Sequence, residues 1–156
     1  MINFWLFVHL TGLVLLAAGV GIANLSGIMM SKSDSPSMIA MWSKVNFRVE
    51  HIATLPGALL LVVAGSILVH KEGYDYSATW IVSAYVLWVI AVFIGAGVLG
   101  RHAHRIHKLA CDEVAAGVEV STTASKLARS PLGPVAGNLL NLIVLAFLYL
   151  MIVKPS

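Results

Sequence analysis

The sequence predicts an all-α membrane protein, an antiparallel bundle of four transmembrane helices that forms one domain over residues 1–156. Four long stretches contain no Lys, Arg, Asp or Glu: residues 4–30, 52–69, 78–100 and 133–153. A helix needs about 20 apolar residues to cross a bilayer, and inside lipid each backbone amide must be bonded within its own segment. Only 11% of all residues are charged, whereas soluble domains average about 25%.

The first stretch, residues 4–30, is predicted to be a retained helix. It is much longer than the roughly 7–15 apolar residues of a signal-peptide core, and no positive charge precedes it. Small residues recur at every fourth position, at Gly19, Ala23 and Gly27. This spacing lets two membrane helices approach closely. A polar turn is expected at residues 31–37, where helix-start residues cluster.

The second stretch is preceded by residues 37–50, in which apolar residues recur with a helical period. We expect a short amphipathic segment there, at the cytoplasmic interface, leading into a helix over residues 52–69. Pro56 lies one turn into that helix and is expected to kink it.

The third stretch follows a tight polar loop at residues 71–77. Its helix is expected to continue past the membrane as far as Ala116, where Gly117 ends it. Residues 118–130 show the weakest pattern, and a short helix is one option there. The fourth helix then covers residues 133–153, and two prolines flank its start.

Basic residues are unequally divided between the connecting segments. The positive-inside rule places the side with more Lys and Arg in the cytoplasm, so both termini and the loop at 70–77 are predicted to lie outside. Eight basic residues lie on the first side and two on the other: Lys32, Lys44, Arg48, Arg101, Arg105, Lys108, Lys126 and Arg129, against Lys71 and Lys154.

The histidines are the main candidates for chemistry. His9 lies about two turns into the first apolar stretch, and ionisable residues inside a membrane are costly enough to suggest a function. A neutral imidazole can bind a metal or a haem iron. A hydrogen bond from His9 to a neighbouring helix is the alternative explanation.

Two pairs of histidines are expected to share a depth, because residues equidistant from a hairpin loop lie at one level. His51 and His102 are centred on the second loop, which places them near the cytoplasmic face. His9 and His70 are centred on the first loop and belong toward the outer face. Both pairs are candidate haem b ligands. For His70, which lies beside two charged residues, a solvated loop position is the alternative.

A metal site is a further candidate on the extension of the third helix. His104, His107 and Cys111 share one helix face at i, i+3 and i+7. His and Cys at this spacing can chelate a transition metal, although a structural zinc takes four ligands. Three basic residues nearby would repel a cation, so a solvated face is the alternative. A single cysteine also excludes an internal disulfide.

Three segments resemble a family of small bacterial predicted integral membrane proteins of unknown function: FVHLTGLVLLAAGVGIANL, EHIATLPGALLLVVAG and LYLMIVKPS. That family is similar to the bacterial membrane protoporphyrinogen IX oxidases and the copper-resistance D proteins. The shared pattern is an early His, here His9, a Pro-Gly pair at 56–57 and a Lys-Pro pair at 154–155. The resemblance implies a multi-pass four-helix bundle in the bacterial inner (plasma) membrane, with haem b bound through His9. The Trp and the basic residue that follow the His in the oxidases are missing from residues 13–24. The resemblance therefore implies the fold and the cofactor more strongly than it implies an oxidase reaction.

We therefore predict a haem-b-binding membrane protein with a redox role, either electron transfer or porphyrinogen oxidation, which would make it a membrane oxidoreductase. One alternative is transition-metal handling or transport of the copper type. Another is a non-catalytic membrane subunit or scaffold. The expected partners are the lipid bilayer and either a second copy of the chain or a membrane redox partner. Nucleic acid is not expected, because the net charge of +3 is not concentrated in a basic run.

Overall fold

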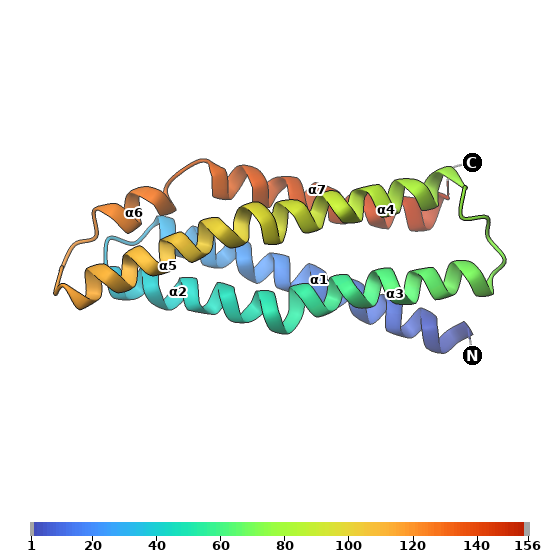
Figure 1. Ribbon diagram of the computed structural model, residues 1–156, viewed down its shortest axis with the longest axis horizontal. Helices are drawn as coiled ribbons and strands as arrows, with labels where there is room; N and C mark the ends of the chain where they lie inside the picture. The colour runs from blue at the N-terminus through green and yellow to red at the C-terminus, as the bar shows by residue number, and fades with distance from the viewer. Residues whose placement is uncertain (1, 155–156) are drawn as a thin grey trace.

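The computed structural model describes residues 2–154, which form a helical bundle without strands (Figure 1). Four continuous helical runs are long and apolar enough to cross a membrane, so the prediction of four spans is confirmed. The helices are α1 (Ile2–Ser31), α2 (Pro36–Val49), α3 (Leu55–Lys71), α4 (Thr79–Val92), α5 (Gly100–Ala115), α6 (Thr123–Ala128) and α7 (Leu132–Val153), with π-helical segments η1 (Glu50–Thr54) and η2 (Phe93–Leu99).

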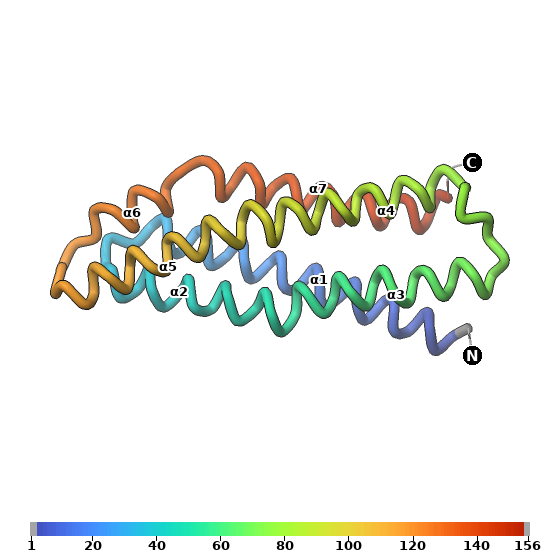
Figure 2. Tube along the Cα trace, viewed as in Figure 1, coloured from blue at the N-terminus to red at the C-terminus, as the bar shows by residue number. Residues whose placement is uncertain are grey.

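The elongated bundle has two ends (Figure 2), and they differ in their content of basic residues. The start of α1, the loop at residues 72–78 and the end of α7 lie together at one end, which we call the terminal end. Helices α2, α5 and α6 form the other end, which we call the basic end. The eight Lys and Arg residues of the first and third connecting segments lie there, so the charge asymmetry of the sequence becomes a difference between the two ends.

The backbones of α1 and α3 touch where two glycines meet. A Cβ added to Gly57 would lie 2.6 Å from the backbone of α1, and one added to Gly12 would lie 2.9 Å from the backbone of α3. Gly19 packs against Thr54 in the same way, whereas a Cβ on Gly27 would have nothing within 4 Å. The expected close approach of the first helix is therefore real, but the prediction that Gly27 takes part in it is wrong.

The second span begins earlier than expected. Helices α2, η1 and α3 form one run from Pro36 to Lys71 without a break. The π-helical segment η1 ends at Thr54, two residues before Pro56. Proline has no N–H and its ring clashes with the carbonyl one turn back, and a widened turn relieves both effects. The helix that was expected to kink at Pro56 therefore contains a π-helical segment just before the proline, and the kink itself stays a prediction.

The third and fourth spans follow the sequence closely. Helix α5 ends at Ala115, and Gly117 has φ +70°. A glycine adopts this left-handed conformation readily, so it ends the helix as predicted. The segment with the weakest sequence pattern contains the short helix α6. Helix α7 begins at Leu132, one residue before the predicted start.

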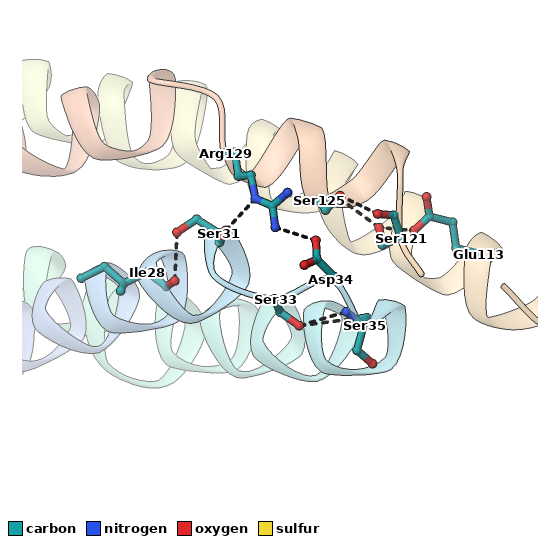
Figure 3. A network of polar contacts seen from close by, with 9 residues as sticks. All are labelled: Ile28, Ser31, Ser33, Asp34, Ser35, Glu113, Ser121, Ser125 and Arg129. Atoms are coloured by element: carbon teal, nitrogen blue, oxygen red, sulfur yellow. Dashed lines mark hydrogen bonds and ion pairs between the residues drawn. The ribbon is translucent and has the colours of Figure 1, made fainter. Parts of the chain in front are cut away.

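Polar contacts close the basic end (Figure 3). Arg129 donates to Asp34 at 2.6 Å and to the Ser31 carbonyl oxygen at 2.9 Å, which ties the end of α6 to the α1–α2 turn. Glu113 accepts hydrogen bonds from the Ser121 hydroxyl and from a backbone N–H of the first turn of α6, the latter at 2.8 Å. These contacts hold α6 across the end of the bundle.

Candidate functional site

A cavity of about 420 Å³ lies among α1, α3, α4 and α7, in the half of the bundle that is nearest the terminal end. Cofactor and ligand sites usually measure about 300–1,000 Å³ and are mostly apolar. Leucine, valine and isoleucine side chains form much of the wall. The polar and amphipathic side chains that line it are His9, Ser66, Glu72, Tyr74, Trp80, Tyr85, Trp88 and Lys154.

His9 is half-buried in the wall of this cavity and is held by a backbone contact. Its Nδ1 lies 3.0 Å from the Leu61 carbonyl oxygen. A carbonyl only accepts hydrogen bonds, so Nδ1 carries the proton and the neutral ring has its lone pair on Nε2. This tautomer, fixed by a bond from the other ring nitrogen, is the usual state of a metal-ligating histidine. Across from it, a Cβ on Gly65 would lie 3.0 Å from His9 Cε1.

Hydrogen bonds join α3 and α4, two of the helices that line the cavity. The Ser66 hydroxyl donates to the Val62 carbonyl oxygen at 2.7 Å, so the Tyr85 hydroxyl, 2.6 Å away, donates to Ser66. Trp88 Nε1 donates to the Ala58 carbonyl oxygen at 3.0 Å. The polar groups of these three side chains therefore have partners within the protein, and most of the remaining lining is apolar.

The part of the cavity wall nearest the terminal end, which we call its mouth, combines a cation with aromatic rings. Lys154 Nζ donates to the Tyr74 hydroxyl at 2.7 Å. It lies 4.7 Å from the centroid of the Tyr74 ring and 5.8 Å from that of Trp80. The two rings meet edge to face at 5.4 Å. Lys154 caps α7 in the left-handed conformation, with φ 45°.

His70 lies outside this cavity. It is exposed in the last turn of α3 and does not line the cavity wall. The structure therefore does not bring the predicted outer pair, His9 and His70, together in one site. The geometry leaves His9 as the single histidine of the cavity.

The predicted inner pair shares a level but not an environment. Glu50 Oε1 lies 3.4 Å from the position of a Cβ on Gly100, so His51, one residue after Glu50, and His102, two residues after Gly100, lie at about the same depth. His51 is exposed, and its Nδ1 is bonded to the carbonyl oxygen one turn back, at 2.9 Å. His102 Nε2 faces the Ser130 hydroxyl at 3.4 Å. The two rings have different partners.

The predicted metal residues are only partly brought together. His107 Nδ1 lies 2.8 Å from the Ser43 hydroxyl, and its Nε2 lies 3.7 Å from Cys111 Sγ. His104 is exposed on the same helix. Within residues 2–154, no three His, Cys, Asp or Glu side chains are placed to hold one metal ion. The geometry therefore gives this predicted site no support.

The sequence patterns did not identify Ser66, Tyr85 and Lys154 as cavity residues. Serine and tyrosine are ordinary in membrane helices, and Lys154 attracts notice only as part of a terminal Lys-Pro pair. Their depth in the bundle could have identified them, because each lies toward the terminal end of its span, as His9 does.

Comparison with known proteins gives one match. The family model described as "Predicted integral membrane protein (DUF2269)" matches residues 4–155. No curated protein and no solved structure matches the chain. The resemblance to the oxidase and copper-resistance families therefore rests on the short sequence motifs alone.

Proposed function

The chain belongs to the DUF2269 family of predicted integral membrane proteins, and from that premise we propose that it binds haem b in the cavity of α1, α3, α4 and α7 and has a redox role. The observation that carries the proposal is the anchored imidazole of His9. Its Nδ1 is engaged by Leu61 at 3.0 Å in the wall of a 420 Å³ cavity, which leaves Nε2 as the nitrogen that can ligate iron.

The residues of the cavity suit a flat, largely apolar macrocycle. His9 would hold the iron, and Leu61 would keep the ring in the ligating tautomer. Gly65 lets the imidazole pack closely against α3, and most of the other lining side chains are apolar. Haem supplies an iron that exchanges one electron at a time, with a potential set by its ligands and surroundings.

Electron transfer is favoured over porphyrinogen oxidation. A porphyrinogen is about as large as the haem itself, and the two would have to share the lining residues of one cavity. His9, as iron ligand, would also not be free to accept a substrate proton. His51, His102 and His70 stay predictions as further ligands, and their surroundings do not favour that role.

The charge asymmetry supports an orientation in the bacterial plasma membrane. The basic end, with eight Lys and Arg residues, would face the cytoplasm, and the terminal end, with two, would face outward. The mouth of the cavity then opens on the outer side, where an electron donor or acceptor of that side could approach.

The test is the optical spectrum of the protein purified from haem-replete cells. The wild-type protein should show a Soret band that shifts on reduction, and His9→Ala should lose it because the iron loses its ligand. His70→Ala is the matched control and should keep the band, because His70 lies outside the cavity. A colourless wild-type protein, or an unchanged spectrum in His9→Ala, would refute the proposal.

A further inference from the structure

We infer that the cavity selects an apolar ligand that carries a carboxylate, and that Lys154 and Tyr74 at its mouth bind this carboxylate. The inference rests on the proposed use of the same cavity for a bound molecule. It adds the chemical class of that molecule, which neither the family match nor the fold supplies.

Lys154 and Tyr74 together offer hydrogen-bond donors to a ligand. An ammonium has three N–H donors, and Lys154 uses one of them for the Tyr74 oxygen at 2.7 Å. Because Tyr74 accepts that bond, its own O–H remains available to donate. Two donors that are 2.7 Å apart can bind the two oxygens of one carboxylate, and charge-assisted bonds of this kind are stronger than neutral ones.

Lys154 and Glu72 are the side chains of opposite charge that line the cavity. Within residues 2–154 the only ion pair with an N–O distance of 4.0 Å or less joins Arg129 and Asp34 at the basic end, so Lys154 lies farther than that from the Glu72 carboxylate. Aromatic rings surround the ammonium instead. Glu72 lines the same cavity, and its negative charge repels a multiply charged head group such as a phosphate monoester more strongly than it repels a single carboxylate.

Lys154 is positioned by its backbone conformation and by its side-chain contact with Tyr74. Lys154 adopts φ 45° at the end of α7, a conformation that is uncommon outside glycine, asparagine and aspartate. Its ammonium contacts Tyr74, which precedes α4, and this contact joins two chain segments across the mouth. Apolar walls below a fixed cation are the pattern of a site for an acidic amphiphile.

Two sources share this chemistry: the propionate groups of a porphyrin and the carboxylate of a fatty acid. The experiment separates them. Purified protein without ligand is titrated with iron protoporphyrin IX and with its dimethyl ester, and the dissociation constants are compared. In a second arm, a bromine-labelled stearic acid and its methyl ester are added to a variant with Trp5→Phe and Trp42→Phe, so that quenching of the remaining Trp80 and Trp88 fluorescence reports entry into the cavity.

Wild-type protein should bind the free acid of at least one probe roughly tenfold tighter than its ester, as one charge-assisted bond implies. Lys154→Gln should abolish this preference and Lys154→Arg should keep most of it. Lys71→Gln, a matched control outside the cavity at the same end, should leave the preference intact. Equal affinity for acid and ester in the wild type, or a preference that survives in Lys154→Gln, would overturn the inference.

The two proposals fail differently in this design. If neither porphyrin binds but the fatty acid binds in a Lys154-dependent way, the carboxylate site stands and the haem proposal is lost. If both porphyrins bind equally in a way that needs His9, and the fatty acid also binds no better than its ester, the haem proposal stands and the carboxylate site is lost.

Discussion

At the scale of single residues, the contact between His9 and Leu61 decides what the site can do. An imidazole in an apolar helix is costly, and here its Nδ1 proton is satisfied by a carbonyl oxygen 3.0 Å away on α3. One ring nitrogen is thereby fixed and the other is left for a ligand. The neighbouring Gly65 keeps the space around that ring clear.

Gly65→Val should lower the affinity for iron protoporphyrin IX by roughly tenfold or more, because even one added Cβ would lie 3.0 Å from His9 Cε1 and a branched side chain would displace the ring. Gly21→Val is the control, since a Cβ on Gly21 has nothing within 4 Å. Titration followed by absorbance measures both. Equal affinities in the two variants would show that the space beside His9 is not part of the site.

His9 could be identified from the sequence because an ionisable residue stands out in an apolar run. The sequence could not identify its partner, the Leu61 carbonyl, because the rotation of α1 about its axis is set by packing against α3. Depth was predictable for His51 and His102, since chain length fixes it in a hairpin. The contacts of each ring were not predictable, because adjacent residues of one helix point in different directions.

At the scale of the elements, the contact of α1 with α3 at Gly12 and Gly57 holds the cavity wall together. Helices in a membrane associate through close packing of small residues, since lipid gives no hydrophobic driving force. The contact also brings the Leu61 carbonyl to His9, because both lie close along the same two helices. The sequence contains several glycines on α1, and only packing distinguishes those at the contact from those that face open space.

Gly57→Ala should therefore lower the free energy of unfolding by about 1–3 kcal/mol, because the new Cβ would lie 2.6 Å from the backbone of α1. Gly27→Ala should leave it unchanged or raise it slightly, since nothing lies within 4 Å and alanine favours helix. Denaturant unfolding in detergent measures both values. Similar stabilities for the two variants would contradict this account of the contact.

At the scale of the whole molecule, the unequal distribution of basic residues gives the bundle a direction. All eight Lys and Arg residues of the first and third segments lie at the basic end, together with the single cysteine, Cys111, which is exposed. The four spans and their order were predictable because length and apolarity determine them. The π-helical segments were not, because they depend on how neighbouring spans fit.

Cys111 should react with a membrane-impermeant maleimide only after the cells are broken, because the basic end is proposed to face the cytoplasm. Ser77→Cys in a Cys111→Ser background should react in intact cells, since the loop at 72–78 lies at the opposite end. Labelling of Cys111 in intact cells would reverse the orientation and place the mouth of the cavity on the cytoplasmic side.

The number of haems per chain tests the central claim most directly. One histidine lines one cavity, and the other predicted ligands, His51, His102 and His70, do not line it. Haem and protein assayed on the same purified sample should give one haem b per polypeptide in the wild type and none in His9→Ala. Two haems per chain, or one that persists without His9, would contradict the account.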